Sequence, residues 1–182
     1  MNNPISSPDS KPQIHTNRYF FDSSGILALI DSGYFHRFCV LIPNFSITPQ
    51  ILSELTIKDN LAKKIITESI SAGKITLVKS KFVKKEKRND YYALGLHTGE
   101  ISILLTAHKK LDVVVFDEIV ARSVARAEGF RLTGLLGLVV NLKKTGNMSK
   151  KEALSFLTAL NHTNFRMSSG LYESMLRRIS ED

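Results

Sequence analysis

The sequence predicts an α/β fold in which a parallel sheet is flanked by helices. Short apolar segments alternate with longer segments whose apolar residues recur at helical spacing. Residues 113–116 are β-branched and aromatic throughout, which is typical of a parallel strand buried on both faces. Thr48 followed by Pro49 supplies a helix start between two such segments. This alternation of strands and helices favours a parallel sheet.

Five short segments have the composition of strands. The first lies within residues 14–21, and the second is expected at residues 39–42, where Pro43 closes it. The remaining three strands are expected at residues 74–78, 113–116 and 130–133.

Helices are expected between these strands. Asp22 opens the first, which continues through residues 26–30, and Pro49 opens a helical stretch that ends near Gly73. Thr98 begins the next, and Gly129 ends the one after it. The last three are expected to begin at Gly134, after the capping box of Ser149 and Glu152, and at Leu171.

Composition is that of a globular protein, with 43% hydrophobic and 23% charged residues among 182. We expect a flexible lead-in over residues 1–16, which has no signal-peptide pattern, and one domain over residues 17–182. Cys39 is the only cysteine, so neither an internal disulfide nor a thiolate zinc site can form. No apolar stretch is long enough to span a membrane, and we expect a cytoplasmic protein.

The net charge of +8 favours a polyanionic partner, although many small soluble proteins are simply basic. Residues 79–90 are the most basic stretch and are expected to form a loop or a mobile helix turn. Its lysines, together with a serine and an arginine near the acids described below, are candidate nucleic-acid contacts: Ser23, Lys81, Lys84, Lys85 and Arg122.

Isolated acids stand where expected strands end and helices begin. Asp22 and Asp117 each follow a strand, whereas Glu54 and Glu100 lie early in helices, and Glu118 adjoins Asp117. Parallel strands gather their carboxyl ends at one edge of the sheet, so these acids are expected in one cleft. Clustered carboxylates repel one another, and a hard divalent cation relieves that repulsion. The pattern therefore predicts a metal-dependent phosphodiester enzyme.

These acids and their neighbours resemble the PIN-domain family over about residues 19–179. The resemblance rests on Gly99-Glu100, on Asp117-Glu118 followed by Ala121-Arg122, and on the ending at residues 164–173. It is closest to the VapC-like toxin ribonucleases. It implies a Rossmann-like parallel sheet, one or two Mg²⁺ or Mn²⁺ ions, RNA as substrate, an antitoxin partner and a homodimer.

The resemblance also assigns roles to individual residues. The catalytic acids would be Asp22, Glu54, Glu100 and Asp117. The metal ligands would be Asp22, Glu100, Asp117 and Glu118.

Other interpretations remain open at this point. Taken singly, Asp22 and Asp117 could be plain helix caps, and Glu54 and Glu100 could be acids that complement helix dipoles. His97, close to Glu100, is more simply explained as a helix-entry residue. The protein could also bind nucleic acid or a partner without cutting, or it could be a DNA- or structure-specific nuclease.

Overall fold

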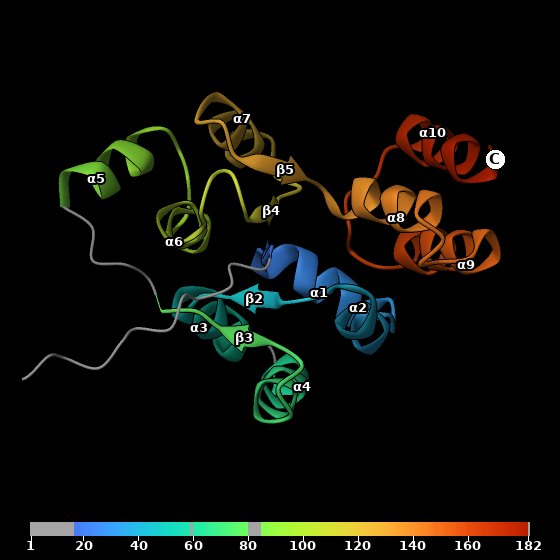
Figure 1. Ribbon diagram of the computed structural model, residues 1–182, viewed down its shortest axis with the longest axis horizontal. Helices are drawn as coiled ribbons and strands as arrows, with labels where there is room; N and C mark the ends of the chain where they lie inside the picture. Colours follow the sequence, from blue (N-terminus) through green and yellow to red (C-terminus); the bar gives the residue numbers. More distant parts are fainter. Residues whose placement is uncertain (1–16, 59, 80–84, 182) are drawn as a thin grey trace, which may run out of the picture.

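The computed structural model describes residues 17–58, 60–79 and 85–181. It confirms the expected α/β class, because a five-stranded, fully parallel sheet is flanked by helices (Figure 1). The strands are β1 (Tyr19–Phe21), β2 (Phe45–Ile47), β3 (Thr76–Leu77), β4 (Val113–Val115) and β5 (Arg131–Thr133).

Ten helices lie within the described residues. The first six are α1 (Ser23–Asp31), α2 (Phe35–Leu41), α3 (Pro49–Lys58), α4 (Asn60–Ser71), α5 (Lys85–Ala93) and α6 (Thr98–Thr106). The others are α7 (Ile119–Ala127), α8 (Leu135–Lys144), α9 (Lys150–Asn161) and α10 (Ser169–Ser180). Helices α8, α9 and α10 pack together at one end of the molecule, and α5 lies at the other end (Figure 1).

The strand order is β3-β2-β1-β4-β5, which makes β1 the central strand. The chain builds outward from β1 to β2 and β3 on one side, and from β4 to β5 on the other. The direction of winding therefore reverses between β1 and β4, where Phe21 pairs with Val115. In open α/β sheets such a switch point leaves a crevice at the carboxyl ends of the strands.

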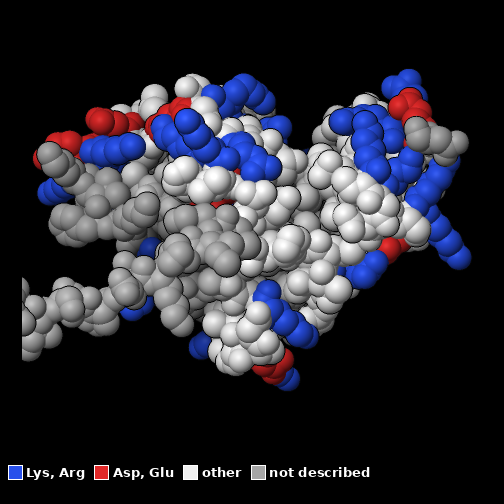
Figure 2. Space-filling model, in the orientation of Figure 1, with Lys and Arg blue, Asp and Glu red and all other residues white. Residues whose placement is uncertain are grey.

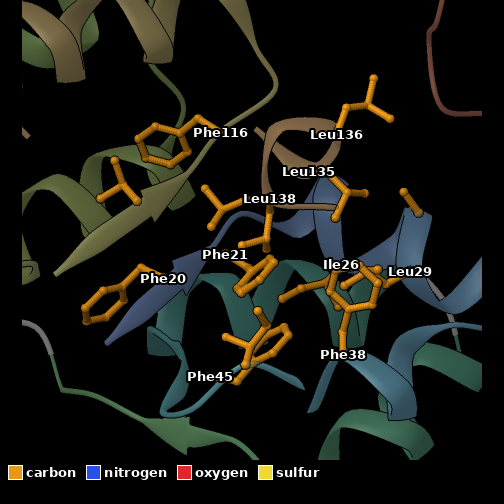
Figure 3. Close-up of a cluster of buried hydrophobic side chains, with 14 of the residues drawn as sticks. Phe20, Phe21, Ile26, Leu29, Phe38, Phe45, Phe116, Leu135, Leu136 and Leu138 are labelled. Carbon is orange, nitrogen blue, oxygen red and sulfur yellow. The ribbon is translucent and has the colours of Figure 1, made fainter. Parts of the chain in front are cut away.

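The core joins the sheet to the helices through aromatic and aliphatic side chains. Phe21 of β1 stacks on Phe45 of β2, with ring centroids 4.0 Å apart and planes within 9° of parallel. Side chains of α1, α2 and α8 surround this pair (Figure 3). Burial of these rings fixes the position of β1 and hence of the residue that follows it.

The expected strand at residues 39–42 is wrong. Residues 39–41 belong to helix α2, Ile42 is the residue that follows it, and the second strand comes after Pro43. The reason is a helical period: Phe35, Phe38 and Ile42 are buried on one face, whereas Val40 points outward and is 73% exposed. A run that contained Val and Ile was interpreted as a strand because only four of its residues were considered.

Two further expectations fall partly or wholly outside the described residues. The N-terminal lead-in, residues 1–16, does so entirely, as do residues 80–84 of the basic stretch. The rest of that stretch, from Lys85, forms helix α5 rather than a loop. Within the described part of the chain, no helix combines the length and the apolar character needed to cross a membrane.

Candidate active site

Four of the five acids singled out above line one cavity of about 490 Å³: Asp22, Glu54, Glu100 and Glu118. The fifth, Asp117, lines an adjoining cavity of about 420 Å³, which shares Ser24 and Glu118 with the first. The structure therefore brings together acids from the ends of β1 and β4 and from helices α3 and α6. We call the first cavity the acid cleft.

Asp22 is held at the start of α1 by local hydrogen bonds. Its Oδ1 accepts from the backbone N–H of Gly25 at 2.7 Å, and its Oδ2 accepts from the Ser24 hydroxyl at 3.0 Å. The side chain is buried, and no cation contributes to its environment. Burial raises the pKa of Asp22 to about 7, and the negative charges of Asp117 and Glu100 push it in the same direction.

Asp117 is fixed by the start of a different helix. Both of its carboxylate oxygens accept from the backbone N–H of Leu135, at 3.1 and 3.2 Å, so Asp117 caps α8 from across the sheet. The Arg122 guanidinium donates to the carbonyl of Phe116 at 2.7 Å, beside this carboxylate. Burial raises the pKa of Asp117, and the Leu135 N–H and the charge of Arg122 offset part of that rise.

Arg122, a candidate nucleic-acid contact, lies beside Asp117 in the structure. A Cβ built on Gly134 would stand 2.6 Å from Asp117 Oδ1 and 2.7 Å from Arg122 Nη1. Only a glycine leaves room for both side chains at this point. The start of α8 therefore sets the place of Asp117.

Glu54 approaches the acid cleft from α3. Its Oε2 accepts from the Ser23 hydroxyl at 2.7 Å, which links α3 to the start of α1. A Cβ on Gly99 would lie 2.7 and 2.8 Å from the two Glu54 oxygens, so Gly99 makes room for this carboxylate. Ser23, whose contact with nucleic acid stays a prediction, donates this hydrogen bond to Glu54.

Glu100 and Glu118 both lie at helix starts. Glu100 Oε2 accepts from the backbone N–H of His97 at 2.8 Å, and Glu118 Oε2 accepts from Ala121 N–H at 2.8 Å. Burial raises the pKa of Glu100, and the charges of Glu118 and Glu54 add to the rise. The capping interpretation and the site interpretation therefore describe the same side chains.

A second buried acid, Asp112, has a cation that offsets the effect of burial on its pKa. Asp112, at the opposite end of β4, forms an ion pair of 2.6 Å with Arg18 and accepts from the backbone N–H of His108 at 2.7 Å. Burial alone would raise the pKa of Asp112, but the hydrogen bonds and charge of Arg18 lower it below its usual range. Among the described residues no cation pairs with Asp22 in this way, so burial destabilises its charged form.

The donor set of the acid cleft suits a hard divalent cation, since its charged ligands are all carboxylate oxygens. Burial and the neighbouring acids raise the pKa of Asp22, and a bound cation would favour its charged form. Among the described residues, no three His, Cys, Asp or Glu side chains are arranged so as to hold an ion. Four of the carboxylates are oriented by backbone N–H groups at four different helix starts, and Glu54 is oriented by the Ser23 hydroxyl.

Of the remaining candidates, the one within the described residues, Lys85, does not line the acid cleft. Lys85 is exposed at the first position of α5, and Lys81 and Lys84 lie outside the described residues. Sequence reasoning missed Phe165, whose segment lines the cavity beside Asp117. Its residues were noted only as part of a familiar ending, and no local signal marks a loop residue that faces a distant helix.

Comparison with known proteins identifies a family and nothing narrower. A family model described as DUF3368: PIN domain matches residues 18–181. No curated protein and no solved structure matches the chain significantly. PIN domains are generally nucleases and typically use divalent metals, so the match supports a nuclease-like fold and a hydrolase in general.

Proposed function

Because the chain belongs to the PIN-domain family, we propose that it is a metal-dependent endoribonuclease that hydrolyses phosphodiester bonds of single-stranded RNA. The observation that carries this proposal is the acid cleft itself. Five carboxylates from four parts of the chain meet beside the switch point of the sheet, and Asp22 is buried there without a cation. Capping hydrogen bonds hold these carboxylates in place, but their burial and crowding raise the pKa of Asp22, and a bound cation would favour its charged form.

In this proposal Asp22, Glu100, Asp117 and Glu118 hold Mg²⁺ or Mn²⁺. When bound, a divalent cation in such a site polarises the scissile phosphate and lowers the pKa of an attacking water. Fixed carboxylates also reduce the reorganisation needed during the reaction. The capping hydrogen bonds of Asp22, Asp117 and Glu118 supply that rigidity.

The chain's own residues divide the remaining work. Glu54, oriented by the Ser23 hydroxyl, accepts the proton released by the attacking water. Arg122 stays on the Phe116 carbonyl and keeps Asp117 in place. Hydrolysis then breaks one P–O bond, and the water supplies the new P–O bond.

We also propose the toxin type of the VapC-like subfamily, with an antitoxin partner and a homodimer. Exposed apolar side chains close to the acid cleft support a protein partner. Leu94 is 56% exposed and Ile119 is 77% exposed, and Gly95 and Val120 bring the end of α5 against the start of α7. Light scattering coupled to size-exclusion chromatography tests the homodimer, and a monomer at all concentrations would contradict it.

The proposed reaction is tested with a labelled pool of single-stranded RNA in Mg²⁺, Mn²⁺ or EDTA. Asp117→Asn keeps the size of the side chain but removes its charge, so we expect folded protein and a loss of cleavage of at least about 100-fold. Glu68→Gln, which removes the charge of an exposed acid on α4, is the control and should cut normally.

The other outcomes separate the alternatives. Binding of RNA without cleavage under any metal condition would favour a non-catalytic protein. Cleavage of DNA but not RNA would favour a DNA nuclease. A folded Asp117→Asn variant that cuts at the wild-type rate would remove Asp117 from the active site.

A further inference from the structure

The cavity beside the acid cleft is built from two segments far apart in the sequence. One wall is α1, with Leu27, Ala28 and Asp31, and the other is the segment 164–166 between α9 and α10. The cavity holds about 420 Å³, within the usual range for small-ligand sites. Because it shares Ser24 and Glu118 with the acid cleft, a polymer bound at the acids continues directly into it.

Phe165 gives this cavity a rigid aromatic wall. Its side chain is half-buried and packs against the hydrophobic core. Its backbone N–H donates to the Thr163 hydroxyl at 3.1 Å, and that hydroxyl donates to the carbonyl of Leu160 at 2.7 Å. The loop is therefore anchored to the end of α9, so the ring is in place before any ligand arrives.

The polar groups of the cavity favour a neutral ring over a phosphate. Asp31, Asp117 and Glu118 would repel a second phosphate group at this point. Asn164, exposed at the rim, offers an amide that both donates and accepts hydrogen bonds. Arg166, also exposed, is the cation of the lining and can meet the backbone on either side of the ring.

We propose that this cavity binds one unstacked base of single-stranded RNA next to the phosphate held in the acid cleft, with Phe165 as the stacking surface. The inference rests on the proposed function for its choice of RNA, but base binding does not require cleavage. A base inside a duplex cannot reach Phe165 without leaving its stack, so the cavity selects single strands.

The absence of tryptophan from the chain provides a direct test. Phe165→Trp places a single fluorophore in the cavity, and Tyr172→Trp places one on α10 against the core, outside the cavity lining. In Ca²⁺, a hard cation that carboxylates hold and that can keep the neighbouring phosphate in the acid cleft, an eight-nucleotide single-stranded RNA should quench Phe165→Trp and leave Tyr172→Trp unchanged. The same RNA as a duplex should quench neither. Equal responses of the two variants would overturn the proposal.

A second measurement uses binding rather than a reporter. Phe165→Leu keeps apolar packing but removes the aromatic face, and we expect the Kd for the single strand in Ca²⁺ to rise about 5- to 100-fold. Phe165→Tyr should bind as wild type, and melting curves establish that each variant is folded. A Phe165→Leu variant with unchanged Kd contradicts base stacking.

The proposal and the proposed function fail in different ways. If Phe165→Leu weakens binding while wild type never cuts RNA, the result supports base binding and contradicts the proposed nuclease activity. Suppose instead that wild type cuts RNA, that RNA does not quench Phe165→Trp, and that Phe165→Leu has the same Kd as wild type. The result then supports the nuclease activity and contradicts the base site.

Discussion

Asp22 makes the folded protein sensitive to pH in a particular direction. Its pKa is raised to about 7 by burial and by neighbouring acids, whereas in the unfolded chain it titrates near 3.8. Between these values the folded state keeps a proton that the unfolded state has released. The free energy of unfolding therefore falls as pH rises from about 4 to 7, and the whole penalty is present above pH 7.

Asp22→Asn should therefore stabilise the metal-free protein at pH 8, by about 1–3 kcal/mol. Asparagine still caps α1 through its carbonyl oxygen, so the helix start is preserved. Chemical denaturation in EDTA at pH 8 and pH 4.5 measures the effect, which should shrink strongly at the lower pH. A variant that is less stable than wild type at pH 8 would show that Asp22 is a structural acid.

Asp112→Asn is the matched control for that experiment and should act in the opposite direction. It breaks the ion pair with Arg18, and a buried pair that loses one partner typically costs about 3 kcal/mol or more. The pKa of Asp112 is lowered, so its stabilising contribution is present above the unfolded pKa and is lost as pH falls. If Asp22→Asn raises the free energy of unfolding and Asp112→Asn lowers it, Asp22 belongs to a binding site and Asp112 is a structural acid.

At the scale of the element, the glycine before α8 controls the position of a carboxylate. Gly134→Ala would place a methyl group 2.6 Å from Asp117 Oδ1, so both Asp117 and Arg122 must move. We expect cleavage to fall at least about tenfold while the far-ultraviolet spectrum is unchanged. Gly170→Ala on α10 is the control, since nothing lies within 4 Å of the added carbon. Equal activity of both variants would contradict this role.

Local signals predicted most of the elements and some of the site. Asp22 and Ser149 mark helix starts that the structure contains, and the β-branched run that became β4 was interpreted correctly. Residues 39–42 were assigned to a strand because their helical period is visible only when Phe35 is included.

The rest of the site depends on tertiary placement. The order of the strands puts β4 beside β1 and so joins Asp117 to Asp22, but no local pattern specifies that order. The cavity at Phe165 is still less visible in the sequence, because α1 and a distant loop form it together. The resemblance to a family supplied the grouping of the acids, whereas the base cavity required the structure.

At the scale of the whole molecule, positive charge gathers at several places on the surface. Lys and Arg side chains gather over α7 and over the end formed by α8, α9 and α10 (Figure 2). Helix α5 carries further cations, and its Arg88 lines a small pocket with Tyr92 and Thr98. Thr98 also lines the acid cleft, so the small pocket at α5 adjoins the cleft.

Removing charge from α5 should therefore weaken RNA binding more than removing the same charge elsewhere. Lys85→Gln combined with Arg88→Gln should reduce the slope of log K against log salt by roughly 1.4, because each phosphate contact on a single strand contributes about 0.7. Lys63→Gln with Lys64→Gln on exposed α4 is the matched control. If the slope of log K against log salt is the same for both double variants, the cations of α5 contribute no more to RNA binding than other surface cations.

The account as a whole depends on the acid cleft being a metal site, and thermal melting tests this most directly. A cation that binds only the folded state raises Tm by mass action, and in this cleft it also relieves the repulsion around Asp22. We predict that Mg²⁺ or Mn²⁺ raises the Tm of the wild type relative to EDTA and that Asp22→Asn abolishes most of that gain. Equal metal-dependent gains in the wild type and in Asp22→Asn would place the ion elsewhere and contradict the account.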